Sequence, residues 1–197
     1  MTANWDDAVR TRDPLEPEGA VILGVAVAVP EPFATALRDS RAATGDPAAV
    51  AVPPHVTIVP PVRVRAEQVP VVVEHVRRAV AGLPRFAVQL EGTATFRPVS
   101  QVVFVRVVDG AQDCDRLQLQ VRTGPLVRRL GFPYHPHVTV AHDVPADALD
   151  RVQGELSDFR AGFDVTSVAV FSCAGDGVWR TLAEAPLAPL ASLRGTS

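Results

Sequence analysis

The sequence contains no lysine, because all 19 basic residues among its 197 are arginine. A lysine Schiff base, a lysine on the phosphates of a P-loop and a covalent lysyl-nucleotide intermediate all require that residue. The composition therefore excludes an ATP-dependent ligase that works through a covalent lysine.

Cysteine is also scarce, since only Cys114 and Cys173 are present. Two isolated cysteines are too few for a disulfide framework or for a cysteine-based zinc site. We expect both to pack as small hydrophobic side chains in a protein of a reducing compartment.

Long hydrophobic runs are missing as well. The apolar run at residues 20–29 is far shorter than a membrane span, and acidic residues precede it where a secretory signal would be basic. These features predict a cytoplasmic protein with no membrane partner. The net charge of −3 disfavours electrostatic capture of DNA but is compatible with a small phosphorylated ligand.

The pattern of apolar residues, prolines and glycines predicts one α+β domain over residues 20–187, between tails at 1–19 and 188–197. Strands are predicted at 20–29, 55–59, 86–92, 101–108, 137–140 and 163–171, and helices at 33–43, 66–81, 112–130 and 146–159. The two halves, about 20–95 and 96–187, therefore share one order: strand, helix, short strand with a histidine, helix, strand.

The two short strands also share part of their amino-acid sequence. Pro-His-Val-Thr stands at residues 54–57 and again at 136–139, and the histidine lies 34 residues after Val21 and 35 residues after Val102. Four identities in a row at matching places indicate an internal duplication. We interpret it as two lobes related by a pseudo-twofold axis rather than as a solenoid, which needs more copies.

Side chains alternate between the two faces of a strand, so His55 and Thr57 should project together, as should His137 and Thr139. If the lobes meet face to face, two imidazoles and two hydroxyls converge on one cleft. This set suits phosphoester chemistry without a metal. One neutral histidine can accept a proton while the other, protonated, donates one to the leaving oxygen. The threonines can donate hydrogen bonds to phosphate oxygens.

Paired His-x-Thr motifs on matching strands of a duplicated chain resemble the two-histidine (2H) phosphoesterase superfamily, in particular its bacterial 2'-5' RNA ligase-like and cyclic nucleotide phosphodiesterase branch. The resemblance covers about residues 20–187. It implies a bilobal fold with two antiparallel sheets facing a central cleft and helices outside. It also implies that His55 and His137 are catalytic, that Thr57 and Thr139 bind phosphate, and that no metal or other cofactor is needed.

The same resemblance implies a phosphodiesterase whose substrates are RNA ends with 2',3'-cyclic phosphates, small cyclic nucleotides or 2'-5' linkages. Separately from the resemblance, we expect a monomer. Many relatives have aromatic residues after the first motif, whereas this chain has the residues Pro-Pro-Val-Arg at 60–63. The identity of the substrate, and which histidine is the acid, therefore stay open.

Few side chains are available to hold a nucleobase, because aromatic residues make up only 6% of the chain. Phe96, Phe132 and Tyr134 lie near predicted strand ends beside the cleft and are the candidates for stacking. Arg63 and Arg97 could reach a substrate phosphate.

Two alternatives remain. His135, His137, His142 and Asp143 could bind a metal for a metal-dependent hydrolase, because His135 and His137 would share a strand face. Against a metal, the first half has no equivalent of His135 or His142, and His135 then sits at the cleft edge, in reach of substrate. The other alternative is a nucleotide-binding module that keeps the fold without turnover.

Overall fold

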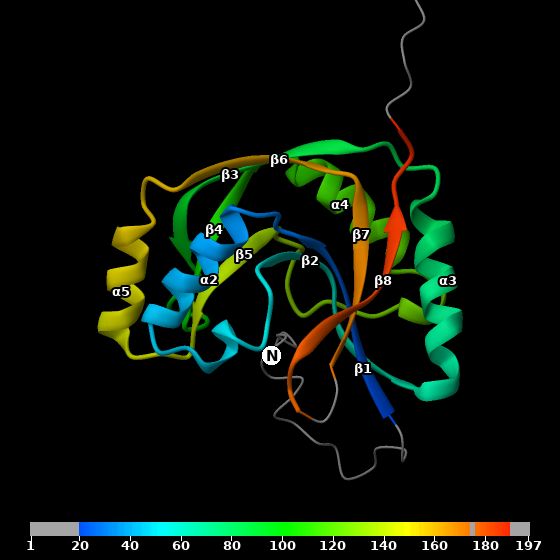
Figure 1. Cartoon of the computed structure of the whole chain (residues 1–197), viewed down its shortest axis with the longest axis horizontal. Helices are drawn as coiled ribbons and strands as arrows, with labels where there is room; N and C mark the ends of the chain where they lie inside the picture. Colours follow the sequence, from blue (N-terminus) through cyan, green and yellow to red (C-terminus); the bar gives the residue numbers. More distant parts are fainter. Residues whose placement is uncertain (1–19, 174–175, 190–197) are drawn as a thin grey trace, which may run out of the picture.

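The computed structural model describes residues 20–173 and 176–189, and two four-stranded antiparallel sheets form its centre (Figure 1). The first sheet has the order β2-β1-β7-β8 and the second the order β5-β4-β3-β6. The strands are β1 (Ala20–Ala28), β2 (His55–Arg65), β3 (Phe86–Thr95), β4 (Val102–Asp109), β5 (His137–His142), β6 (Arg160–Val165), β7 (Ser167–Cys173) and β8 (Trp179–Pro186). The predicted α+β class with two antiparallel sheets is confirmed.

Four helices pack around the sheets within the described residues: α2 (Phe33–Ala43), α3 (Val69–Val80), α4 (Ala111–Val121) and α5 (Ala146–Glu155). Helix α3 contacts β7 and β8, and α5 contacts β3, β4 and β5, so these two helices lie at opposite ends of the molecule (Figure 1). Helix α2 contacts β5, and α4 contacts β2. Each half of the chain therefore sends one helix onto the histidine strand of the other half.

The spatial lobes do not coincide with the sequence halves 20–95 and 96–187. Strand β3 ends the first half, yet it pairs with β4 and β6 in the second sheet. Strands that follow each other closely tend to pair as neighbours, and only a short connection separates β3 from β4. The first sheet is then completed by β7 and β8 from the end of the chain.

The single strand predicted at 163–171 is wrong. Two strands occupy this region: β6 pairs in the second sheet and β7 in the first, with Thr166 between them. The apolar pattern continues across the crossing point, so periodicity alone gives no sign of the change of sheet. Strand β8 was not predicted.

The helix predicted at 112–130 is too long. Helix α4 ends at Val121, and only a short 3-10 turn, Gly124–Leu126, follows before an irregular segment leads to β5. Proline cannot continue an α-helix and glycine disfavours it, and Gly124 and Pro125 stand together at this point.

Strand β2 is longer than the predicted 55–59, because it continues through Pro60 and Pro61 to Arg65. Proline removes a donor from the sheet ladder, so it is tolerated on edge strands. Strand β2 is an edge strand of its sheet. The carbonyls of both prolines accept hydrogen bonds from Arg128 Nη1, at 3.0 and 2.6 Å.

One hydrophobic cluster extends through both sheets and all four described helices. A smaller cluster, with Ala26, Phe171 and Trp179 among its members, covers the opposite face of the first sheet. Strand β1 is thus buried on both faces, as its unbroken apolar run requires. Cys114 and Cys173 are buried, as predicted.

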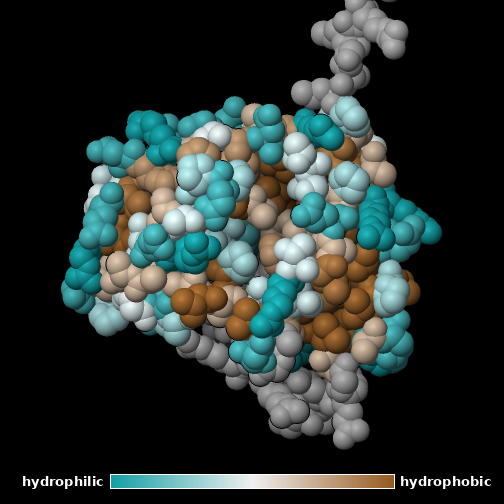
Figure 2. All heavy atoms as spheres, viewed as in Figure 1, coloured by the Kyte–Doolittle hydropathy of each residue, from teal (hydrophilic) through white to brown (hydrophobic). Residues whose placement is uncertain are grey.

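The structure describes the chain on both sides of the predicted C-terminal bound of the domain at residue 187. Ala188, placed in the predicted C-terminal tail, pairs with Pro84. The predicted tail 1–19 and residues 190–197 lie outside the described residues. In the view of Figure 1, Figure 2 shows hydrophobic surface in the region of β1 and β8. Leu182 of β8 is one of the exposed large hydrophobic residues. None of the helices in the described ranges is long and apolar enough to cross a membrane.

Candidate active site

The two His-x-Thr motifs occupy equivalent positions in the two sheets. In the first, His55 lies opposite Ala28 of β1, and Thr57 lies opposite Ala26. In the second, His137 and Thr139 lie opposite residues 106 and 104 of β4. Residues directly opposite each other project from the same face of a sheet. We call the face that carries the histidine and threonine the motif face.

A β-bulge follows the threonine in both strands. Ile58 is the extra residue between Thr57 and Val59 in β2, and Val140 is the extra residue in β5. A β-bulge bends its strand and can re-aim a neighbouring side chain. The register makes Val102 equivalent to Gly24 rather than to Val21. The spacings of 34 and 35 residues were counted to each histidine from Val21 and from Val102. These two residues lie near the starts of their strands but are not equivalent in register.

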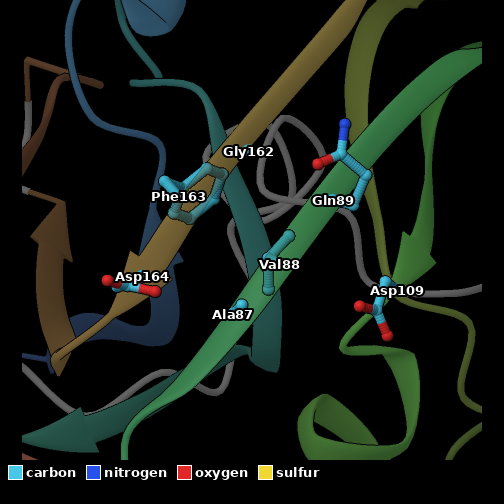
Figure 3. A pocket seen from close by; sticks show the side chains of 7 residues that line it. All are labelled: Ala87, Val88, Gln89, Asp109, Gly162, Phe163 and Asp164. Atoms are coloured by element: carbon cyan, nitrogen blue, oxygen red, sulfur yellow. The ribbon is translucent and has the colours of Figure 1, made fainter.

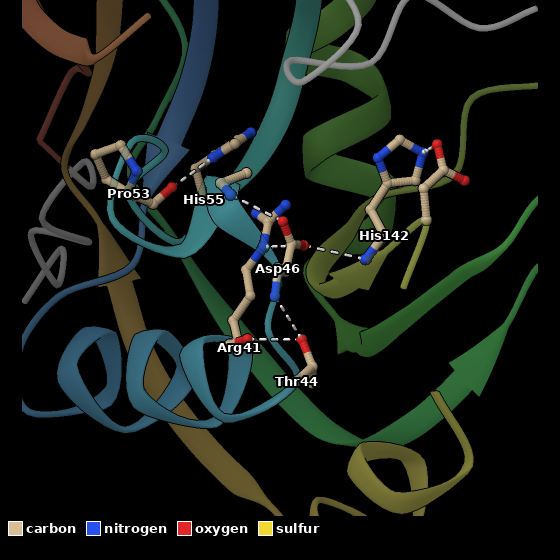
Figure 4. Close-up of polar contacts among 8 residues, drawn as sticks. Arg41, Thr44, Asp46, Pro53, His55 and His142 are labelled. Atoms are coloured by element: carbon tan, nitrogen blue, oxygen red, sulfur yellow. Dashed lines mark hydrogen bonds and ion pairs between the residues drawn. The ribbon is translucent and has the colours of Figure 1, made fainter. Parts of the chain in front are cut away.

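Each histidine is held by the backbone carbonyl two residues before it. His55 Nδ1 lies 2.7 Å from the oxygen of Pro53 (Figure 4). His137 Nδ1 lies 2.7 Å from the oxygen of His135. A carbonyl oxygen only accepts, so Nδ1 carries the hydrogen in both rings. In the neutral rings Nε2 is then the nitrogen that can accept a proton.

His137 is packed between aromatic rings. The centroids of Phe96 and Phe104 lie 5.1 and 5.0 Å from that of His137, and the His135 ring lies 6.0 Å away. Burial lowers the pKa of His137 to about 4. The hydrogen bond to the His135 carbonyl opposes this shift, and the charge of the His135 side chain adds to it more weakly. The imidazole of His137 is therefore neutral at physiological pH.

His55 has a different environment. Its Nε2 lies 3.1 Å from Thr57 Oγ1, so the threonine hydroxyl donates to the neutral ring. Phe171 of β7 lies beside it, with ring centroids 6.4 Å apart. The histidine and threonine of the first motif are thus in direct contact on the motif face.

The two histidine strands lie side by side. Strands β2 and β5 are in contact although they belong to different sheets. The Tyr134 hydroxyl donates to the carbonyl of Thr57 at 2.9 Å, which joins the segment before β5 directly to the first motif. Burial raises the pKa of Tyr134 well above its usual value, so this hydroxyl stays protonated.

A buried carboxylate joins the same two parts of the molecule. Asp46 Oδ2 accepts from Arg41 Nε at 2.8 Å and from the backbone N–H of His142 at 3.1 Å, while Oδ1 accepts from the backbone of Ala48. Figure 4 shows Asp46 between Arg41 of α2 and His142 at the end of β5. We call Arg41, Asp46 and His142 the lobe clasp.

The sequence pattern of the 2'-5' RNA ligase superfamily matches residues 29–177 of the chain. This match covers well over half of its length. The chain belongs to this superfamily. The predicted resemblance to the two-histidine phosphoesterases is therefore confirmed.

Individual relatives support this assignment. A Halalkalibacterium halodurans protein named as a phosphoesterase is 30% identical over 111 residues, which cover 56% of this chain and 64% of the relative. A Geobacillus kaustophilus protein named likewise is 26% identical over 105 residues, covering 53% of this chain and 60% of the relative. The chain thus matches less than two thirds of the length of these relatives.

Solved structures show the same fold. Escherichia coli LigT in complex with 3'-AMP superposes with a TM-score of 0.60 at 17% identity, covering 85% of this chain and 98% of LigT. TT0787 of Thermus thermophilus gives a TM-score of 0.57 at 21% identity, covering 84% and 97%. The bilobal arrangement of this superfamily member is therefore shared with proteins of low sequence identity.

The aromatic residues predicted to contact the substrate lie in different environments. Phe96 lies edge-on against His135 and His137, and Phe132 is half exposed in the segment before β5. Tyr134 directs its hydroxyl to Thr57 and packs against the main core. Contact of any of these side chains with a substrate stays a prediction.

Arg97, predicted to reach a phosphate, points to helix α5 instead. Its Nη1 lies 2.7 Å from Asp150 Oδ1, and its Nη2 donates to Gln153 Oε1 at 2.9 Å. These partners satisfy the guanidinium within the protein. The side chain therefore serves to hold the segment after β3 on α5.

The metal alternative lacks its ligand set. His142 Nε2 lies 3.3 Å from Asp143 Oδ2, whereas His135 and His137 pack with Phe96 and Phe104. Within residues 20–173 and 176–189, no group of three or more His, Cys, Asp or Glu side chains is placed to hold a metal ion.

A shallow pocket of about 300 Å³ lies elsewhere on the second sheet. Figure 3 shows its lining from β3, β6 and the end of β4, with Gln89, Asp109 and Asp164 as its polar side chains. No residue of either motif lines it, so it gives no support to a second reaction centre.

Proposed function

We propose that this protein is a metal-independent phosphoesterase that hydrolyses a 2',3'-cyclic phosphodiester, or a related 2'-linked one, at an RNA end or on a small nucleotide. One observation carries the proposal. Two histidines stand at register-equivalent positions on two strands that contact each other from different sheets. A carbonyl fixes each ring at Nδ1, which leaves Nε2 as the nitrogen able to exchange a proton. Such a pair can supply both a base and an acid.

His137 is the general base in this proposal. Its ring is neutral because burial lowers its pKa, with Phe96 and Phe104 packed against it, and its Nε2 can accept a proton. It takes a proton from a water molecule as the water oxygen forms a bond to phosphorus. A base with a lowered pKa is available over most of the pH range, although its intrinsic basicity is modest.

His55 is the general acid. When protonated, it keeps Nδ1–H on the carbonyl of Pro53 and has Nε2–H to donate. The bond from phosphorus to the ribose 2'- or 3'-oxygen breaks, and that oxygen receives the proton from His55. The products are a nucleotide monoester and a protein that regains its resting protonation by exchange between the two rings and water.

Thr57 and Thr139 support the phosphate in this scheme. Both lie on the motif face two residues after a histidine, so each hydroxyl can donate to a non-bridging oxygen where charge develops. Thr57 donates to the neutral ring of His55 in the structure. Once Nε2 of His55 carries a hydrogen it no longer accepts, so the Thr57 hydroxyl hydrogen can turn toward a phosphate oxygen while its oxygen can accept from Nε2–H.

The comparisons support the choice of a nucleotide. LigT has been solved with 3'-AMP, a nucleotide whose phosphate is on the ribose 3'-oxygen. Hydrolysis of a 2',3'-cyclic phosphate at the 2'-oxygen would leave the phosphate in the same place. The relatives named as phosphoesterases agree with the reaction class.

The test is turnover of adenosine 2',3'-cyclic phosphate with EDTA present, with 2'- and 3'-AMP separated by chromatography. We expect turnover that resists EDTA and gives one monoester, whose position shows which bond breaks. Loss of activity in EDTA, restored by a divalent metal, would favour the metal-dependent hydrolase. Binding of nucleotide without any product would favour the non-catalytic module.

A further inference from the structure

The two lobes differ at the position opposite the histidine. Ala28 lies opposite His55 in the first sheet, whereas Arg106 lies opposite His137 in the second. The positions opposite the threonines differ in the same sense, with Ala26 in the first sheet and Phe104 in the second. The pseudo-twofold axis therefore relates a small, uncharged surface to one that carries a guanidinium.

The guanidinium of Arg106 is anchored but not neutralised. Its Nε donates to the carbonyl of Glu91 at 3.1 Å, and the side chain is exposed. In the described part of the chain no carboxylate pairs with it, because the Glu91 side chain is taken by Arg160 at 2.8 Å. The two terminal amino groups of Arg106 remain available to an anion.

The neighbouring backbone leaves room for this arrangement. Gly92 has a φ of +59°, and a Cβ there would lie 2.9 Å from the Ser157 carbonyl oxygen and 3.4 Å from Arg106 Nη2. A side chain at this position would therefore be strained and would press on the guanidinium. Glycine thus allows Arg106 to lie along β3 with its terminal groups toward solvent.

A fixed guanidinium with two free amino groups is suited to a phosphate, which it can bind in a bidentate manner. Arg106 and His137 project from the same face of adjacent strands, where Cβ atoms are about 5 Å apart. The Arg106 side chain runs from there toward β3, so its terminal groups lie away from the histidine. It is therefore placed for a phosphate other than the one that reacts.

We propose that Arg106 holds a second phosphate of the substrate, on the 5'-oxygen of the nucleoside that carries the reacting phosphodiester. This inference rests on the proposed function. In a nucleoside 2',3'-cyclic phosphate both secondary hydroxyls are used, so the 5'-oxygen alone can carry another phosphate. Because only one lobe has the cation, the substrate binds in a single orientation despite the symmetry of the motifs.

The first experiment compares three substrates: adenosine 2',3'-cyclic phosphate, its 5'-phosphorylated form, and a dinucleotide with a cyclic end. We expect kcat/KM of the wild type to be about tenfold or more higher for the two with a 5'-phosphate, as is typical of a hydrogen bond to a charged group. Arg106→Gln should bring this ratio close to one. The matched control Arg116→Gln, in α4, should keep the wild-type ratio.

The two phosphorylated substrates distinguish the sources of the phosphate. A higher kcat/KM for the dinucleotide than for the 5'-phosphorylated mononucleotide identifies an RNA end. Equal values identify the phosphate alone. A wild-type ratio near one, or an equal loss for all three substrates in Arg106→Gln, would overturn the inference.

A binding experiment separates this inference from the proposed function. The dissociation constants of 3'-AMP and adenosine 3',5'-bisphosphate are measured by calorimetry, without any need for turnover. We expect the bisphosphate to bind about tenfold more tightly to the wild type, and equally to 3'-AMP in Arg106→Gln. If this holds but no substrate is turned over, the proposed function fails and the role of Arg106 stands. Absence of the preference, or of binding, would overturn it.

Discussion

Each motif histidine follows a proline, and the structure gives this a physical reason. Pro54 and Pro136 stand between the histidine and the residue whose carbonyl binds Nδ1. Proline fixes its own φ and keeps the preceding residue extended. The repeated text Pro-His-Val-Thr therefore encodes the ring orientation as well as the chemical groups.

The first prediction concerns the pH dependence set by His137. A base works only when it is neutral, so lowering its pKa extends activity toward acid. With the pKa lowered to about 4 by burial, loss of the base should reduce kcat/KM only below about pH 4, which sets the acid limb of the profile. The measurement is a kcat/KM profile between pH 3 and 8. An acid limb near the usual histidine value of about 6.5 would contradict the assignment.

The variant Phe96→Ala tests the cause of the shift. Removing this ring admits water to His137, so the acid limb should move upward toward about 6.5. The control is Phe132→Ala, because Phe132 is half exposed and outside the ring packing of His137. In this control variant the acid limb of the kcat/KM profile should lie at the same pH as in the wild type, even if kcat/KM itself changes.

At the residue scale, the repeated motif points to the candidate histidines and threonines but not to the side chains and carbonyls that contact them. The catalytic and phosphate-binding roles of these histidines and threonines stay predictions. The histidines and threonines are visible because their text is repeated. Arg106 and Asp46 carry no comparable signal. The placement of Arg106 opposite His137 depends on strand register, and that of Asp46 beside His142 on contacts between remote segments. Single-sequence periodicity reports neither.

Among the elements, the segment between α4 and β5 is held on strand β2 at two points. Arg128 donates to the carbonyls of Pro60 and Pro61, and Tyr134 donates to the carbonyl of Thr57. These contacts explain how an irregular segment stays ordered beside the first motif. They also satisfy carbonyls at the free edge of the sheet.

The second prediction is that Arg128→Met destabilises the protein by about 1–3 kcal/mol, since it leaves two carbonyls without their donor. The free energy of unfolding is measured by chemical denaturation. The matched control is Arg129→Met, because Arg129 is the exposed neighbour, and its effect should stay within about 0.5 kcal/mol. Equal effects of the two variants would count against the docking role.

Element predictions from the sequence succeeded where the signals were local. Helix α2 has the predicted bounds 33–43, and proline and glycine mark its ends. They failed where tertiary structure decides. The change of sheet at Thr166 leaves the apolar pattern unbroken, and the passage of β2 through Pro60 and Pro61 requires its edge position.

On the scale of the whole molecule, the lobe clasp fixes the two parts that carry the motifs. Asp46 joins the end of α2 to the end of β5 through buried contacts. The predicted repeat is present in the structure, yet α2, α4 and β3 each pack on the other half. The sequence gives no sign of this packing between halves. A duplication repeats the order of the elements along the chain, but it does not say which elements pack together.

The third prediction is that Asp46→Ala lowers the free energy of unfolding by about 3–5 kcal/mol, because Arg41 is then left as a buried charge without this carboxylate. The control is Asp39→Ala, at an exposed position of α2, which should change it by no more than about 0.5 kcal/mol. Denaturation of both variants by urea gives the comparison. A loss below 1 kcal/mol for Asp46→Ala would contradict a clasp.

The most direct test of the account measures single-turnover hydrolysis of adenosine 2',3'-cyclic phosphate by His55→Ala, His137→Ala and the double variant, with His75→Ala as control. His75 binds the carbonyl of Val121, away from both motifs. The account predicts that each single variant loses about 10²–10⁴-fold in rate. The double variant should lose little more, because the two histidines act as a unit. A single motif variant that keeps the wild-type rate would contradict the paired-histidine mechanism.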